Sequence, residues 1–138
     1  KFLGWRNLDD AILVGCGNLG ASLLGYEGFK KYGFNIVLGF DNDRNKIGKQ
    51  IHNIDIYPIE LLPKIIEKMH IKIGIITVNA ENAQEVADLM ISGGIKAIWN
   101  FAPAALNLPE DIILQQHDMA AALAVLSKKL EGLLKNTD

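Results

Sequence analysis

The chain has 138 residues, of which 49% are hydrophobic and 22% are charged, and its formal net charge is −2. This size and composition predict one soluble globular domain with a hydrophobic core. The charge balance excludes strong non-specific binding to nucleic acid, which needs an excess of Lys and Arg to contact phosphates. A single cysteine excludes an internal disulfide framework, and no apolar stretch approaches the roughly 20 residues of a membrane span. We therefore expect a cytoplasmic protein with no membrane partner.

An apolar run over residues 11–14 predicts a strand that leads directly into a glycine-rich turn. Gly15, Gly17 and Gly20 have the Gly-x-Gly-x-x-Gly spacing, and a helix is expected over residues 21–32. A strand, this turn and a helix in that order are typical of dinucleotide-binding folds. The first glycine permits a tight turn, the second lets a pyrophosphate approach the backbone, and the third allows close packing of helix on strand.

The next predicted strand covers residues 34–40 and ends in Asp41, which follows Gly20 by 21 residues (41 − 20). An acidic residue at about this offset accepts hydrogen bonds from the ribose hydroxyls of adenosine. A carboxylate there also repels a 2′-phosphate, so the sequence favours NAD(H) over NADP(H). Arg44 and Lys46 weaken this preference, because either side chain can reach a phosphate.

The rest of the chain alternates between predicted strands and helices. This alternation predicts an α/β fold, a Rossmann-like, doubly wound and mostly parallel sheet with helices on both faces. Residues 1–10 are then a lead-in, residues 11–117 the nucleotide-binding domain and residues 118–138 a C-terminal helix. The predicted strands are 54–57, 72–78, 95–101 and 112–116, and the predicted helices are 58–69, 81–91 and 118–135. The first of these helices begins with Pro58, and its inward face carries Leu61, Leu62, Ile65, Ile66 and Met69.

The carboxyl ends of the predicted strands carry small or polar residues. Ligands of open α/β sheets bind at these ends. Thr77 and Asn100 can hydrogen-bond a ribose or a nicotinamide amide, and Phe101 and Pro103 can cover one face of a ring. Capping of the following helix or loop explains Thr77 and Asn100 equally well, and the sequence leaves both interpretations open.

The last predicted helix carries an apolar stripe. Met119, Leu123, Leu126, Leu130 and Leu133 recur at intervals of 4, 3, 4 and 3 residues, which is a heptad-like spacing over roughly 27 Å of helix. The spacing alone fits equally well a helix that packs on its own sheet and a helix that packs on a second copy of the chain.

Several longer segments carry more information than the glycine spacing. They are residues 14–20 (Val-Gly-Cys-Gly-Asn-Leu-Gly), 25–29 (Gly-Tyr-Glu-Gly-Phe), 39–43 with 46–48, 100–103 (Asn-Phe-Ala-Pro), 108–111, and Asp118 with Leu126-Ser127. In these segments, which run along nearly the whole chain, the sequence resembles the dinucleotide-binding domain of the Rex family. That family consists of bacterial redox-sensing transcriptional repressors.

The resemblance implies that one site binds NADH and NAD⁺ and that NADH binding releases DNA. It also implies an N-terminal winged-helix DNA-binding domain that is absent from this chain, and a homodimer formed by exchange of the C-terminal helix. Tyr26 and Asp118, with Met119 beside them, then link that helix to the partner's cofactor site. The sequence patterns and the resemblance together predict the following cofactor-binding residues: Gly15, Cys16, Gly17, Asn18, Leu19, Gly20, Asp41, Asn42, Thr77, Val78, Asn100, Phe101, Ala102 and Pro103.

The sequence predicts no catalytic residue and no metal site. Hydride transfer to a substrate needs a proton donor or acceptor beside a substrate pocket, whereas His52, His70 and His117 lie in contexts typical of exposed or capping histidines. Cys16 is either a redox-sensitive thiol at a helix start or a small packing residue. The alternative for the whole chain is a CoA- or nucleotide-binding Rossmann module of a ligase or dehydrogenase. A CoA site needs a basic group for the ribose 3′-phosphate, which Asp41 does not supply.

Overall fold

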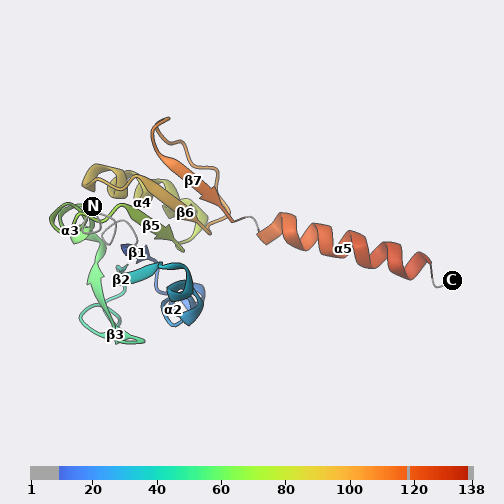
Figure 1. Cartoon of the computed structure of the whole chain (residues 1–138), viewed down its shortest axis with the longest axis horizontal. Helices are drawn as coiled ribbons and strands as arrows, with labels where there is room; N and C mark the ends of the chain where they lie inside the picture. The colour runs from blue at the N-terminus through green and yellow to red at the C-terminus, as the bar shows by residue number, and fades with distance from the viewer. Residues whose placement is uncertain (1–9, 118, 137–138) are drawn as a thin grey trace.

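The computed structural model describes residues 10–117 and 119–136 (Figure 1). Asp118 and residues 1–9 of the predicted lead-in (1–10) lie outside the described residues, whereas Asp10 is the first residue of the first strand. The described strands form one sheet in the order β3-β4-β2-β1-β5-β6-β7, and all neighbouring strands are parallel except β3 and β4. The strands are β1 (Asp10–Val14), β2 (Asn35–Asp41), β3 (Gln50–Ile51), β4 (Ile54–Pro58), β5 (Ile73–Ile76), β6 (Ala97–Asn100) and β7 (Ile113–Gln116).

The order of the parallel strands is that of dinucleotide-binding folds. Numbered along the chain without β3, the parallel strands lie in the order 3-2-1-4-5-6, which reverses between β1 and β5. The crevice outside the carboxyl ends of the strands at this reversal is where such folds bind their ligand. β1 is central, and residues Ala11, Ile12, Leu13 and Val14 are fully buried because both faces of the sheet are covered there.

Two groups of helices cover opposite faces of the sheet (Figure 1). One face packs against α2 (Asn18–Leu24) and the 3-10 helix η1 (Glu27–Tyr32). The other face packs against α3 (Leu62–Met69), which follows the 3-10 turn η2 (Ile59–Leu61), and against α4 (Ala80–Gly93). The predicted doubly wound, mostly parallel Rossmann-like sheet is therefore confirmed.

The helix predicted over residues 21–32 is not continuous. α2 ends at Leu24, and η1 begins only at Glu27. Gly25 lies between them, and glycine has a low helix propensity. The ring of His52 also occupies the space into which a side chain at Gly25 would extend. The chain therefore breaks where glycine is needed for close approach of the β3–β4 hairpin.

The prediction that Pro58 begins a helix is wrong. Pro58 is the last residue of β4 and pairs with Asp41 of β2, whereas Pro63 occupies the first turn of α3. Leu61 and Met69, which were expected to face the core, are exposed. Leu61 belongs to the 3-10 turn before α3, and Met69 is the last residue of α3, so neither side chain lies on the buried face of that helix.

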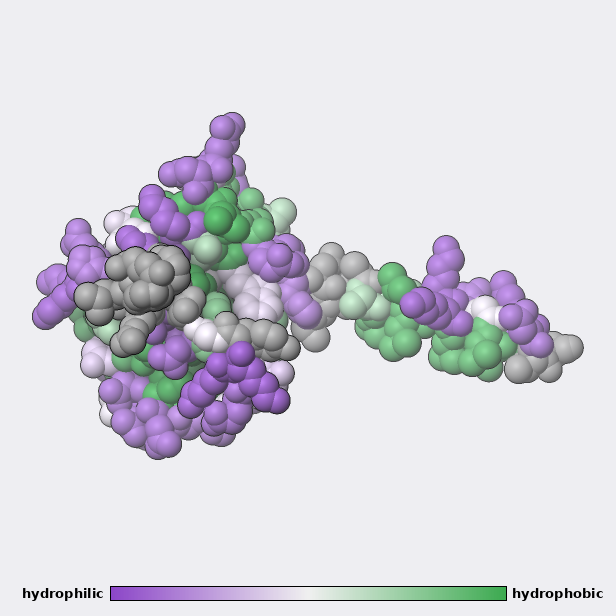
Figure 2. All heavy atoms as spheres, in the orientation of Figure 1, coloured by the Kyte–Doolittle hydropathy of each residue, from purple (hydrophilic) through white to green (hydrophobic). Residues whose placement is uncertain are grey.

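The final helix, α5 (Met119–Lys135), projects away from the sheet domain (Figure 1). Its apolar residues gather along the helix surface, as Figure 2 shows in green. The stripe residues Leu123, Leu126, Leu130 and Leu133 are each at least 53% exposed. Soluble monomers rarely present a contiguous apolar surface of this kind.

Candidate functional site

A cleft opens at the carboxyl ends of β1, β2 and β5, at the reversal in strand order. Its volume is about 530 Å³, within the range of small-molecule and cofactor sites. Six of the predicted residues line it, namely Gly15, Gly17, Asp41, Asn42, Thr77 and Val78. The sheet topology thus brings together the glycine turn, the strand-end carboxylate and the polar end of β5.

Two of the three glycines are required by the fold. Gly15 has a φ of +105°, which side-chain-bearing residues rarely adopt, and a Cβ there would lie 2.7 Å from the backbone of Thr77. A Cβ at Gly20 would collide with the carbonyl oxygen of Gly15. These two positions therefore hold β1, the turn and α2 in close contact.

Gly17 is different, because nothing in the fold requires a glycine there. Its φ is −74°, and a Cβ would meet no atom within 4 Å. Within the described residues, the backbone N–H groups of Gly17, Asn18, Leu19 and Gly20 have no hydrogen-bond acceptor. Unpaired N–H groups beside open space are the arrangement that binds phosphate oxygens.

Both carboxylate oxygens of Asp41 accept a backbone hydrogen bond, one from the glycine turn and one from the turn after β2. Its Oδ2 accepts a hydrogen bond from the backbone N–H of Cys16 at 2.8 Å, and its Oδ1 accepts one from the N–H of Asp43 at 2.9 Å. Asp41 is only partly buried and lines the cleft. Each carboxylate oxygen can accept a second hydrogen bond, so the side chain can also hold a ribose hydroxyl.

The sequence suggested that Lys46 could reach a ribose phosphate, but its side chain binds the backbone of the glycine turn instead. Its Nζ donates a hydrogen bond to the carbonyl oxygen of Cys16 at 2.7 Å, and Lys46 is not among the residues that line the cleft. Arg44 is exposed and does not line it either. Neither cation lies in the cleft to attract a ribose phosphate.

The thiol of Cys16 lies inside the protein. Cys16 is 1% exposed, and its Sγ donates to the carbonyl oxygen of Phe40 at 3.5 Å. Burial, and secondly the charge of Asp41, raise the pKa of the Cys16 thiol to about 11, although Lys46 and the hydrogen bond to Phe40 oppose this shift. A raised pKa and burial are typical of an inert packing residue rather than a redox-sensing thiolate.

We expect the folded protein to alkylate at Cys16 with iodoacetamide at pH 8 at least about tenfold more slowly than the urea-unfolded chain. The native thiol keeps its proton between about pH 8.5 and about 11, where the unfolded thiol loses it. The free energy of unfolding should therefore fall as pH rises through this range, and should fall less in a Cys16→Ala variant. Equal alkylation rates for folded and unfolded protein would contradict this account.

Thr77 and Asn100 both organise backbone. The hydroxyl of Thr77 lies 2.6 Å from the carbonyl oxygen of Gly15 and 3.0 Å from that of Val14. Asn100 is fully buried, its Nδ2 lies within hydrogen-bonding distance of the carbonyl oxygens of Ala102 and Ala104 and of the Gln116 side chain, and its Oδ1 accepts from the N–H of Ala102. Asn100 thus shapes the loop after β6, with its amide facing into the protein.

Aromatic residues form a packed row from that loop to η1. The ring of Phe101 packs at a tilt against His117 and against Trp99, with centroid distances of 4.9 and 4.8 Å. Trp99 lies edge-on to Phe29, which in turn contacts Tyr26. The row therefore joins the last described residue before α5 to Tyr26, which is itself 57% exposed.

The structure places the remaining predicted residues around the cleft rather than on its wall. Asn18 and Leu19 are exposed in the first turn of α2, while Ala102 is buried and Pro103 exposed in the loop after β6. Asp118 and the side chain of Met119 lie outside what the structure describes. The sequence analysis missed seven residues of the cleft wall. Two of them follow the end of β4, and the others follow the end of β5 or lie on α4, so their places after strand ends could have indicated several of them: Ile59, Glu60, Asn79, Asn82, Glu85, Val86 and Leu89.

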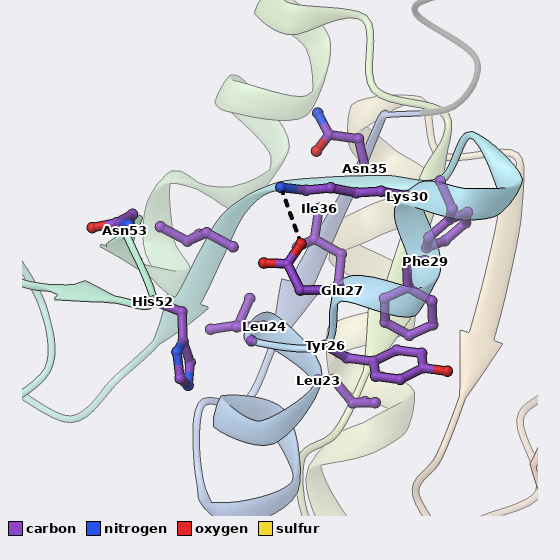
Figure 3. A pocket seen from close by; sticks show the side chains of 13 residues that line it. Leu23, Leu24, Tyr26, Glu27, Phe29, Lys30, Asn35, Ile36, His52 and Asn53 are labelled. Carbon is purple, nitrogen blue, oxygen red and sulfur yellow. Dashed lines mark ion pairs between the residues drawn. The ribbon is translucent and has the colours of Figure 1, made fainter.

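A second cavity, of about 330 Å³, lies between α2, η1 and the β3–β4 hairpin (Figure 3). His52 extends from the hairpin on one side, and Tyr26 and Phe29 lie on the other (Figure 3). Glu27 and Lys30 form an ion pair at 3.5 Å beside it, but both side chains are exposed, so the pair contributes little stability. This cavity is separate from the strand ends that carry the glycine turn.

Among residues 10–117 and 119–136, no three His, Cys, Asp or Glu side chains are grouped so that they could hold a metal ion. In the same part of the chain, no helix combines the length and hydrophobicity needed to cross a membrane.

Comparison with known proteins places the chain in a family. Residues 7–104 match the CoA binding domain family. The chain is 47% identical over 130 residues to the redox-sensing transcriptional repressor Rex of Pelotomaculum thermopropionicum, covering 94% of this chain and 61% of that protein. It is 39% identical over 137 residues to Rex of Treponema denticola, covering 99% and 63%. The chain thus spans about three-fifths of the length of these curated relatives.

Solved structures agree with the sequence relatives. RSP, a Rex-family repressor, superposes with a TM-score of 0.86 at 36% identity over 99% of this chain and 66% of RSP. RSP bound to β-NADH gives the same TM-score at 35% identity, covering 99% of this chain and 68% of that one. RSP has also been solved with β-NAD⁺ and operator DNA. By fold, by sequence identity along nearly its whole length and by its CoA binding domain, the chain belongs to the Rex family.

Proposed function

We propose that this chain is the NAD(H)-binding part of a cytoplasmic redox-sensing transcriptional repressor, in which NADH binding releases DNA. Residues 11–117 form the NAD(H)-binding domain and residues 118–138 the dimerisation helix. DNA is contacted by a winged-helix domain outside this chain, and no reaction is catalysed. Support comes from the Rex relatives and from the RSP structures with β-NADH and with β-NAD⁺ and operator DNA.

One observation carries the cofactor assignment. The open backbone at Gly17 and the carboxylate of Asp41 line the same cleft at the reversal in strand order. In this arrangement the glycine turn takes the pyrophosphate and Asp41 takes the adenosine ribose. The predicted residues off the cleft wall then act indirectly, since Asn100 holds the loop that carries Phe101, Ala102 and Pro103 toward the nicotinamide side.

The charge of the cleft favours NAD(H) over cofactors with an additional phosphate on the ribose. Three carboxylates, those of Asp41, Glu60 and Glu85, line the cleft, and no Lys or Arg is among its described lining residues. A 2′-phosphate in NADP(H) or a 3′-phosphate in CoA would meet negative charge without a compensating cation. The match to a CoA binding domain keeps CoA as the second candidate ligand.

We expect Asp41→Ala to raise the dissociation constant for NADH about 10- to 100-fold, because a hydrogen bond to a charged group contributes about 1.5–3 kcal/mol. Asp55→Ala is the matched control, since it removes an exposed carboxylate from β4. Fluorescence titration with NADH measures both variants. If Asp41→Ala binds NADH as tightly as Asp55→Ala, Asp41 is not the ribose ligand.

Two uncovered apolar surfaces in the described chain support a homodimer in which α5 is exchanged. One is the stripe of Leu123, Leu126, Leu130 and Leu133 on α5. The other is a groove of about 280 Å³ on the half of the sheet face over β5, β6 and β7 that α2 and η1 leave bare. An isologous pair of copies would bury both surfaces at once. Trp99 and Ile113, the latter 69% exposed, lie in that groove.

The exchange would place the start of the partner's α5 near the aromatic row that ends at Tyr26. Asp118 and Met119 are then the residues that link cofactor binding to the dimer, as the resemblance implies. Cofactor binding can shift the dimer between DNA-binding and released forms only to the extent that NADH and NAD⁺ bind those two forms with different affinity.

A further inference from the structure

Two side chains, one at the end of β2 and one in the turn that follows it, hold the peptide groups on either side of Cys16. The N–H of Cys16 belongs to the Gly15–Cys16 peptide and donates to Asp41 Oδ2 at 2.8 Å. The carbonyl oxygen of Cys16 belongs to the Cys16–Gly17 peptide and accepts from Lys46 Nζ at 2.7 Å. Asp41 and Lys46 therefore fix consecutive peptide planes in the middle of the glycine turn.

The bond to Lys46 sets the direction of the Gly17 N–H. In a planar trans peptide the C=O and the following N–H point in opposite directions. Lys46 draws the carbonyl of Cys16 toward itself, so the N–H of Gly17 is directed away from Lys46. That N–H has no acceptor within the described residues, and the space beside Gly17 is open.

Without Lys46 this peptide plane would be loosely held. Gly17 has no side chain to restrict rotation on one side of the peptide, and glycine tolerates conformations that other residues avoid. A rotated peptide would present the carbonyl of Cys16, in place of an N–H, to the cofactor. A carbonyl oxygen repels a phosphate oxygen, whereas an N–H binds it.

Lys46 is itself held in place by the turn after β2. The N–H of Asp43 donates to Asp41 Oδ1 at 2.9 Å, and the N–H of Lys46 donates to the carbonyl oxygen of Asp43 at 2.9 Å. A continuous set of hydrogen bonds thus runs from Asp41 through the turn to Lys46 and back to Cys16. Lys46 is partly buried, so moving its ammonium to another partner would cost free energy.

We propose that Lys46 is a positioning residue that orients the N–H of Gly17 toward the cofactor pyrophosphate. This inference rests on the proposed NAD(H) binding and deepens it. It assigns to Lys46 the preparation of the pyrophosphate subsite and gives it no contact with a ribose phosphate. Its loss should weaken ligands that carry a pyrophosphate and leave the adenosine subsite intact.

The test compares Lys46→Met with Lys46→Arg and with the control Lys49→Met, which removes an exposed positive charge three residues away. Binding of NADH and ADP-ribose is measured by calorimetry, and binding of adenosine, which has no phosphate, by saturation-transfer NMR. We expect Lys46→Met to weaken NADH and ADP-ribose about tenfold, the effect of one charge-assisted hydrogen bond, and to change adenosine binding less than about twofold. Lys46→Arg should retain most of the affinity, because a guanidinium can still donate to the Cys16 carbonyl.

Three results would overturn the inference while leaving the proposed function standing. They are unchanged NADH binding in Lys46→Met, adenosine weakened as much as NADH, and an equal loss in Lys49→Met, which would indicate general electrostatics. Retained adenosine binding also shows that Lys46→Met is folded. Wild-type protein that binds neither NADH nor ADP-ribose contradicts the proposed function itself, and the inference with it.

Discussion

Gly17→Val is expected to abolish NADH binding while the protein stays folded. The backbone of Gly17 has a φ of −74° and a ψ of −159°, which valine adopts readily, and a Cβ there meets no protein atom within 4 Å. The valine side chain would instead occupy the space proposed for the pyrophosphate. We expect the dissociation constant to rise at least about 100-fold, which corresponds to about 2.8 kcal/mol. Calorimetry measures binding, and circular dichroism with thermal unfolding checks the fold.

Gly20→Val is the contrasting variant within the same turn. A Cβ at Gly20 would collide with the carbonyl oxygen of Gly15, so this change should destabilise the fold itself and lower the unfolding temperature. We expect Gly20→Val to lose NADH binding because it loses the fold, and Gly17→Val to lose NADH binding while it stays folded. This difference separates the structural role of Gly20 from the ligand-binding role of Gly17. A Gly17→Val protein that binds NADH like the wild type shows that the pyrophosphate lies elsewhere.

Leu126→Glu combined with Leu130→Glu is expected to convert the proposed dimer to a monomer. Both leucines lie in the exposed stripe of α5. Burial of one leucine side chain contributes about 1.5–3 kcal/mol, and in a symmetric dimer each change occurs twice. We therefore expect the dimer dissociation constant to rise more than about 1000-fold. Light scattering coupled to size exclusion should show a mass near that of one 15.2 kDa chain in place of two.

The matched control is Ala124→Glu combined with Lys128→Glu, which also places two glutamates on α5. At 3.6 residues per turn these positions lie away from the stripe, so the control should remain a dimer. A stable dimer in the Leu126/Leu130 variant contradicts helix exchange. A wild-type monomer contradicts the proposed dimer directly.

The sequence predicted the sheet and its glycine turn well, because their signals are local. Each signal lies within one short segment of the chain: the apolar run over Ala11 to Val14, the spacing from Gly15 to Gly20, and the acidic end of β2. They depend on the rule that parallel strands alternate with helices. The apolar stripe on α5 was likewise indicated by its spacing, although the spacing could not choose the surface that covers the stripe.

The misses come from contacts between distant segments. The turn of the β3–β4 hairpin uses His52 and Asn53 at φ values of 50° and 68°, and no glycine marked it. The break at Gly25 depends on the packing of His52 from that hairpin. Lys46 was expected to be able to reach a phosphate. Its position in the sequence gave no indication that its ammonium would donate a hydrogen bond to the carbonyl oxygen of Cys16. Hydrogen bonds over 30 residues of chain leave no local pattern.

Calorimetric titration of the wild-type chain with NADH, NADPH and CoA tests the central claim most directly. The acidic cleft and the paired Lys46 predict saturable binding of NADH at one site per chain, with NADPH and CoA at least about tenfold weaker. Binding of CoA at equal or higher affinity than NADH, or the absence of NADH binding, would contradict the assignment of this cleft to NAD(H).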